Sequence, residues 1–230
     1  MKNIINASLL LCGLVSIIFA YPSEVDSEAL RYKTMSAVRT ATPPKIDGKL
    51  DDSVWSNAIV LNDFIQYEPY NLEPPSVETE VRVLYDDSFM YIAFENFDPE
   101  PSTIMDRISR RDDFESIEKN VDWVGFGIDS NDDDMTGNWF MLTAAGVQLD
   151  VSINESGGWR DKYDISWNAV WDGKTHIHSQ GWSAEIRVPF NVFQFTKDDI
   201  QTWGGTFQRG YFKDQEQIHW PGTVSYTHLT

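Results

Sequence analysis

One tryptophan of this sequence stands in a short loop between glycines and charged residues, Gly157-Gly158-Trp159-Arg160-Asp161. An exposed indole can stack on the apolar C–H face of a sugar ring, while nearby charged groups bind the ring's hydroxyls. Trp159, Arg160 and Asp161 are therefore candidate carbohydrate-binding residues, and Trp139, which follows an acidic turn, is a fourth candidate. For the other seven tryptophans of the chain's nine, a place in the core is the simpler interpretation.

An acidic turn over residues 129–134 could do a second kind of chemistry. Acids or amides at its first, third and fifth positions match the start of an EF-hand. However, Asp134 stands where that loop needs glycine and Phe140 where it needs glutamate, so an EF-hand is excluded. A solvated turn and a site for a hard cation explain the pattern equally well. The candidate calcium ligands are Asp129, Asn131, Asp133 and Asp122, the last of which flanks the same predicted strand.

Catalytic motifs are not evident in the sequence. His176 and His178 share one face of a predicted strand, but no third metal ligand accompanies them. The chain has no His-Glu-x-x-His, no Gly-x-Ser-x-Gly and no phosphate-binding loop. Glycosidases use paired carboxylates, but among 36 acidic residues some pair will always look suitable. The sequence therefore predicts a binding protein and supplies no catalytic residues.

The excess of acidic over basic residues argues against one class of partner, nucleic acids. The chain carries 36 acidic and 18 basic residues, a formal net charge of −18. Nucleic acid binding needs a basic face, so a nucleic acid partner is not expected.

The N-terminus has the pattern of a secretory signal peptide over residues 1–20: a lysine at position 2, an apolar run over 7–20, and polar residues afterwards. The run is shorter than the roughly 20 residues that span a bilayer. Cys12, the chain's only cysteine, lies inside it, so the mature protein is expected to fold without disulfides. A polar leader is predicted over 21–35.

Short alternating segments dominate the rest of the chain. In 77–85 the odd positions are apolar or threonine, and 89–97 forms the returning strand of a hairpin. Further strands are predicted at 121–129, 139–144, 147–153, 167–171, 175–179, 182–188 and 202–212, and a short helix at 50–58 is expected to place Trp55 in the core. This pattern predicts an all-β fold, an antiparallel β-sandwich or jelly roll with short helical turns, as one domain over 36–222.

In this order, the segments resemble a known family. Ile46-Asp47-Gly48-Lys49-Leu50-Asp51-Asp52-Ser53-Val54-Trp55 is similar to the opening signature of carbohydrate-binding module family 9. The resemblance continues at 79–87, 91–94, 98–99, 122–124, 146–150, 166–171, 181–190, 203–204, Arg209 and Trp220. The later motifs resemble a branch in which this module precedes an outer-membrane β-barrel in bacterial envelope proteins. Full-length members of that branch are described as hydrolases involved in carbohydrate catabolism.

The resemblance implies a β-sandwich that binds a glycan or oligosaccharide without catalysis, with calcium as a cofactor. It also implies export to the periplasm or outer membrane of a Gram-negative bacterium, and a C-terminal barrel in the same chain. The two tryptophans and the arginine that clamp a sugar in the wider family have no evident counterpart here. Residues 223–230 resemble a translated sequencing adapter, so we expect a non-native tail on a truncated chain.

Two other functions stay open at this point. The sandwich could be a structural or gating domain of an outer-membrane transporter, which the missing clamp residues would suit. It could also bind haem, since related folds hold haem through methionine, and Met90, Met105 and Met141 are the available thioethers. A methionine in a strand is, however, more often part of the core.

Overall fold

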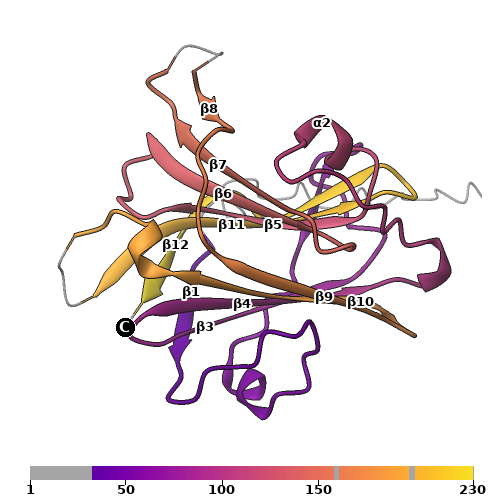
Figure 1. The fold of residues 1–230 in the computed structure, drawn as a ribbon, viewed down its shortest axis with the longest axis horizontal. Helices are drawn as coiled ribbons and strands as arrows, with labels where there is room; N and C mark the ends of the chain where they lie inside the picture. The colour runs from indigo at the N-terminus through magenta and orange to yellow at the C-terminus, as the bar shows by residue number, and fades with distance from the viewer. Residues whose placement is uncertain (1–32, 158–160, 197–199, 230) are drawn as a thin grey trace, which may run out of the picture.

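The computed structural model describes residues 33–157, 161–196 and 200–229, with side chains as far as Trp220. Its strands form two layers, which we call the upper and lower sheets as they lie in Figure 1. The predicted signal peptide, most of the predicted leader, and Trp159 and Arg160 lie outside the described residues. The all-β sandwich predicted from the sequence is confirmed.

The upper sheet has the strand order β8-β7-β6-β5-β11-β12, and β2 also pairs with β12. Its neighbouring strands are antiparallel. The strands are β2 (Ile65–Glu68), β5 (Trp123–Asp129), β6 (Thr136–Thr143), β7 (Gln148–Asn154), β8 (Tyr163–Asp164), β11 (Gln201–Tyr211) and β12 (Glu216–Leu229).

The lower sheet has the order β3-β4-β10-β9, again with antiparallel neighbours. Strand β1 (Met35–Arg39) joins the two sheets, because its first half pairs with β12 and its second half with β3, both in parallel. The lower-sheet strands are β3 (Thr79–Tyr85), β4 (Phe89–Phe97), β9 (Asp172–His178) and β10 (Gly181–Pro189).

The main core lies between the sheets and is rich in aromatic residues. Phe126 and Phe140 stack at 4.8 Å between ring centroids, and Trp171 meets Phe140 edge-on. Trp182 and Trp203 are also fully buried there. Because successive side chains of a strand point to opposite faces, the buried alternate positions follow from the sequence pattern.

Each sheet also has a covered outer face. The 3-10 helix η1 (Ser53–Asn57) lies below the lower sheet and packs Trp55 against Tyr91 and Ala93 (Figure 1). Helix α2 (Phe114–Ile117) lies above the upper sheet and covers part of its outer face. The 3-10 helices η2 (Pro101–Thr103) and η3 (Phe190–Val192) lie in connecting segments.

Two local predictions were inaccurate. The segment 167–171 is not a strand, because Asp150 binds the backbone amide of Ala169 and the indole of Trp171 and holds the segment as an extended connection. The helix expected at 50–58 is a single 3-10 turn, although Trp55 is buried as predicted. Among the described residues, none of the helices has the length and apolar character needed to cross a bilayer.

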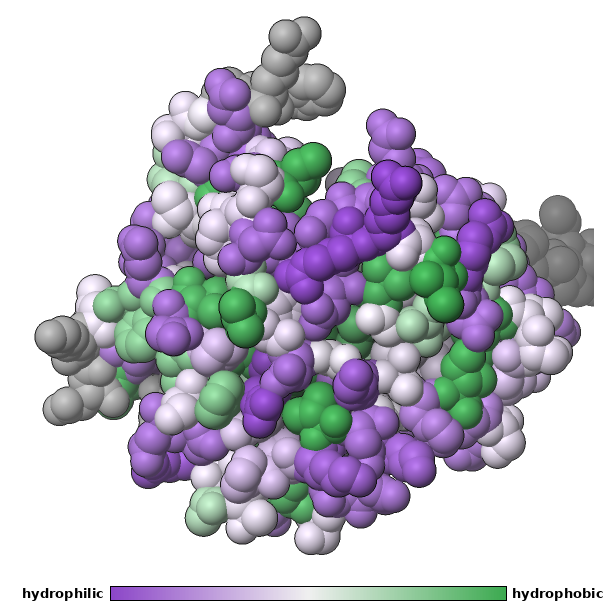
Figure 2. Space-filling model, viewed as in Figure 1, coloured by the Kyte–Doolittle hydropathy of each residue, from purple (hydrophilic) through white to green (hydrophobic). Residues whose placement is uncertain are grey.

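The outer surface of the upper sheet is hollowed between two projections. Figure 2 shows an open notch between the β7–β8 hairpin and α2. Apolar residues on the face in view occur as separate small groups among hydrophilic ones.

Candidate functional site

A β-bulge in β2 gives the upper sheet an unusual pair of neighbouring side chains. Gln217 of β12 pairs with Glu68, but the next residue, Ile218, pairs with Gln66, so Tyr67 is the extra residue. Gln66 is buried, while Tyr67 stacks on His219 and Glu68 contacts Lys119. A β-bulge changes the direction of the side chains around the extra residue. Here it leaves two consecutive residues, Tyr67 and Glu68, on the outer side of the sheet.

The first part of the site is an exposed aromatic ring. Tyr67 and His219 are parallel within 8°, with 4.5 Å between their ring centroids. Tyr67 is 49% exposed, so the face of its ring that does not contact His219 is open to solvent. Burial lowers the pKa of His219 to about 4, which keeps the imidazole neutral at ordinary pH. The result is a flat aromatic surface held in one orientation by an uncharged partner.

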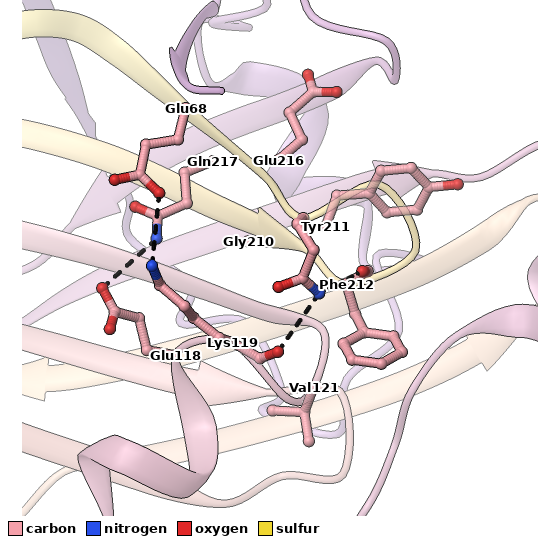
Figure 3. Close-up of a pocket in the computed structure, with 10 residues that line it drawn as sticks. Glu68, Glu118, Lys119, Val121, Gly210, Tyr211, Phe212, Glu216 and Gln217 are labelled. Carbon is pink, nitrogen blue, oxygen red and sulfur yellow. Dashed lines mark hydrogen bonds and ion pairs between the residues drawn. The ribbon is translucent and has the colours of Figure 1, made fainter. Parts of the chain in front are cut away.

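The second part is a pocket of about 80 Å³ that is lined in part by Glu68, the residue after Tyr67. Gln217 and His219 are two residues apart on β12, so they lie on the same face, about 7 Å from each other. Figure 3 shows Glu68, Gln217, Lys119 and Glu118 close together on one side of Gly210, and Tyr211, Phe212 and the carboxylate of Glu216 on the other. The polar lining consists of Glu68, Glu118, Lys119, Gln215, Glu216 and Gln217.

Two contacts between charged or amide side chains of the pocket are long. Lys119 Nζ lies 3.9 Å from Glu68 Oε2, and Gln217 Nε2 lies 3.5 Å from Glu118 Oε1. The side chains of Lys119 and Glu68 are 62% and 47% exposed. An exposed pair at this distance contributes about 0–1 kcal/mol, so a ligand can replace it at little cost.

Buried residues support the wall of the pocket. Arg209, which is fully buried, lies 5.4 Å from the ring centroid of Tyr211. Glu216 accepts hydrogen bonds from the amide and hydroxyl of Ser76, which fixes the start of β12. Burial and the nearby charge of Asp98 raise the pKa of Tyr211, so its phenol stays protonated and can donate or accept.

The predicted sugar-binding residues lie on the same sheet but away from this pocket. Trp139, in β6, is half-buried and packs edge-on against Trp123 and Phe114. Its indole covers Gly125, where an added Cβ would lie 3.2 Å from Trp139 Nε1. Asp161 is exposed beside the β7–β8 hairpin. The structure does not bring Trp139 and Asp161 into one site with the pocket.

The four predicted calcium ligands are not assembled either. Asp122 precedes β5 and Asp129 is its last residue, so the length of the extended strand separates them. Asp122 is buried and accepts from the amides of Met105 and Phe212. In the acidic turn, Asp129 accepts from the backbone amides of residues 131, 133 and 134, and Asp133 from those of 135 and 136. Burial, the largest effect, raises the pKa of Asp129.

These carboxylates therefore hold the turn through its own backbone, and Asn131 binds Thr136. Across the described part of the chain, no group of three or more histidine, cysteine or acidic side chains is arranged to hold a metal ion. The predicted set does not fit a calcium ion. Calcium binding elsewhere in the domain stays a prediction.

Other predicted residues have ordinary surroundings. His178 Nε2 lies 2.8 Å from Glu95, and the His176 ring is 6.1 Å from the His178 ring. Met90 and Met141 are buried in the core, and Met105 packs against α2's apolar cluster. None of these contacts favours haem ligation.

The sequence contains only a weak signal for the pocket. Tyr67 and Glu68 stand directly before Pro69, and residues 216–219 precede Trp220 without a recognisable binding motif. The pairing of β2 with β12 joins residues about 150 positions apart in the chain, which periodicity cannot reveal.

No protein-family model matches the sequence, and no curated protein sequence matches it. Solved structures do match the fold. A carbohydrate-binding module family 9 domain from Caldicellulosiruptor kristjanssonii, in complex with glucose, is 16% identical with a TM-score of 0.61, covering 86% of this chain and 96% of that one. The same kind of domain in complex with cellotriose is 17% identical, with a TM-score of 0.61 and coverage of 86% and 94%.

A third structure, of a protein from Bacteroides uniformis assigned provisionally to carbohydrate binding, is 12% identical with a TM-score of 0.63. It covers 86% of this chain and 99% of that one. At such identities the likeness concerns the fold alone. The resemblance that the sequence motifs predicted is thereby confirmed at this level: the protein has the fold of a family 9 carbohydrate-binding module.

Proposed function

We propose that this domain binds carbohydrate, without catalysing its cleavage, at the pocket beside Tyr67. The observation that carries the proposal is the exposed Tyr67 ring, held flat on His219 next to carboxylate and amide groups. A sugar ring has an apolar C–H face and an edge of hydroxyls, so it needs both kinds of surface at once. Structures of this fold in complex with glucose and cellotriose support the same function.

The pocket's chemistry suits hydroxyl groups. Glu68 and Glu118 offer carboxylate oxygens that are held only by long contacts, and hydroxyls can donate to them. Lys119 and the amide of Gln217 offer donors for hydroxyl oxygens. The proposal assigns these groups to hydrogen bonds with sugar hydroxyls and includes no catalytic residue.

Isothermal titration with glucose and cellotriose tests the proposal on the full chain. Tyr67→Ala should abolish measurable binding or weaken it at least severalfold, because it removes the stacking surface. Tyr70→Ala is the matched control: Tyr70, two residues after the end of β2, is 68% exposed but stacks on no ring in the described structure. Equal binding by Tyr67→Ala and the parent protein would reject this site. Absence of binding to any member of a broad glycan panel, with the protein folded, would reject the function.

We further propose that the domain is exported and acts in the periplasm or outer membrane, as the signal-like residues 1–20 suggest. Fractionation of cells expressing the natural full-length gene tests this. Recovery of the uncleaved chain in the cytoplasm would contradict it.

A further inference from the structure

A fully buried asparagine near the end of the sandwich lacks hydrogen-bond partners in the described protein. Asn96 is 0% exposed, and neither its Oδ1 nor its Nδ2 has a partner. It lies in β4, whose residues Phe94 and Ile92 are part of the core between the sheets. Leaving a buried amide unsatisfied costs about 1–3 kcal/mol, so something other than a side chain must satisfy it.

Neighbouring buried polar atoms are unsatisfied as well. Strand pairing places Trp182 directly opposite Asn96 in β10, and its indole Nε1 has no partner although the residue is 0% exposed. Two residues after Asn96, Asp98 is 4% exposed. Its Oδ1 accepts from the amide of Glu100 at 2.7 Å, but its Oδ2 has no partner.

Arg209 completes the group from the opposite sheet. Its Nη1 donates to Thr79 Oγ1 at 3.1 Å, and Thr79 pairs with Asn96 on the side away from Trp182. Its Nη2 donates to the carbonyl of Phe97 at 3.0 Å. The remaining guanidinium donor, Nε, is buried and has no partner. Four side chains at one end of the core thus have five unsatisfied polar atoms: three nitrogens that donate and two oxygens that accept.

We infer that Asn96, Asp98, Trp182 and Arg209 form an internal hydration site, which holds ordered water between the two sheets. The mixture of donors and acceptors decides the class of ligand. The positive charge of the Arg209 guanidinium would repel a metal cation, and the N–H groups of Asn96 and Trp182 cannot act as its ligands. The carboxylates of Asp98 and Asp122, whose negative charges favour the protonated form of Arg209, would repel an anion. Water is neutral, donates twice and accepts twice.

The number of unsatisfied atoms also bears on the occupancy. One water makes about three hydrogen bonds, with a maximum of four, and the site offers five atoms. Two waters are therefore expected. They would link β4, β10 and β11, in addition to the direct bonds from Arg209, and so fix the position of one sheet relative to the other beneath the Tyr211 wall of the pocket.

A crystal structure that resolves ordered water tests the inference on the unmodified protein. We expect water within hydrogen-bond distance of Asn96 and of Asp98 Oδ2. Crystals soaked in bromide and in manganese should show no anomalous peak at the site. An ion at this position would overturn the inference, and so would clear density in which rearranged side chains satisfy all five atoms without water.

Oxygen-17 relaxation dispersion in solution gives a second test, because it counts long-lived internal waters. Asn96→Leu, which removes one acceptor and one donor group at similar volume, should lower this count by at least one. Asn168→Leu, at an exposed position, is the matched control and should leave the count unchanged. Equal counts for all three proteins would overturn the inference. If Asn96→Leu does not fold, the crystal structure of the parent protein decides independently.

Discussion

Replacement of Arg209 by methionine is the strongest test of how the two sheets are held together. Arg209 is 0% exposed and reaches from β11 in the upper sheet to β3 and β4 in the lower sheet. It donates to the carbonyl of Glu78 at 3.0 Å, as well as to Thr79 and Phe97. Burial lowers its pKa to about 10, so it remains charged in the folded protein at neutral pH.

The size of the effect follows from what Arg209→Met leaves behind. Methionine retains an unbranched apolar stem of similar reach but cannot donate a hydrogen bond. Two carbonyls and a hydroxyl lose their donor, and the buried carboxylates of Asp98 and Asp122 lose their counter-charge. Leaving buried charge without its compensating partner costs about 3–5 kcal/mol. We expect a loss of that order in the free energy of unfolding.

Urea titration followed by tryptophan fluorescence measures this loss. If the slope is near 3 kcal/mol per M, the midpoint should fall by roughly 1–1.7 M. Arg187→Met is the matched control, because Arg187 is 38% exposed, pairs with Asp172 at the surface and lies 4.9 Å from the Phe89 ring centroid. The control should lose no more than about 1.5 kcal/mol. Similar losses for the two variants would show that the buried guanidinium does not hold the sheets together.

Three further predictions concern the site and its sheet. The pKa of His219 is about 4 in the folded protein and near 6.5 in the unfolded chain, so the unfolded chain binds a proton first as the pH is lowered. The free energy of unfolding should therefore fall between about pH 6.5 and about pH 4, with up to about 3 kcal/mol of the loss due to this residue. Urea titrations should show that His219→Phe lacks this part of the loss, and an unchanged pH dependence would contradict the burial argument. Gly210→Ala should lower the melting temperature and reduce the free energy of unfolding by about 1–3 kcal/mol, because the new Cβ would lie 2.1 Å from Trp123 Nε1. An unaltered melting curve would show that the indole does not lie over Gly210. Finally, glucuronate should bind more weakly than glucose at low salt, and Glu118→Gln should narrow the difference in calorimetric titrations; equal affinities would indicate that the pocket's carboxylates do not face the sugar.

Local sequence patterns predicted the elements of this fold because the relevant forces are local or periodic. The alternation in 79–83 follows directly from one buried and one partly exposed face of that part of β3. Turns such as Asp86-Asp87-Ser88 also form from neighbouring residues, and here Asp86 accepts from the amides of Ser88 and Phe89. The motifs that resemble family 9 modules extend this local information to the arrangement of the whole domain.

The candidate site could not be predicted in the same way. Tyr67 becomes a platform only because a bulge turns it outward and because His219, on another strand, lies beneath it. Trp139 had the favoured side chain and a place beside an acidic turn, but Gly125 provides space for its indole against the sheet. Residue type indicates which side chains could contact a ligand, whereas register decides which of them remain available.

Carboxylates also differ in whether the fold leaves them available to a ligand, and this difference favours the pocket over the acidic turn as the candidate site. Glu185 is fully buried and accepts from two backbone amides and from the indole of Trp55, so all its capacity serves the fold. Asp129 is similarly engaged by three backbone amides of its own turn. Among the described residues, the carboxylates of Glu68 and Glu118, in contrast, have only contacts of 3.9 and 3.5 Å, at the edge of a cavity. A carboxylate that already accepts several short hydrogen bonds has little to offer a ligand, whereas these two retain their acceptor capacity beside an open aromatic ring.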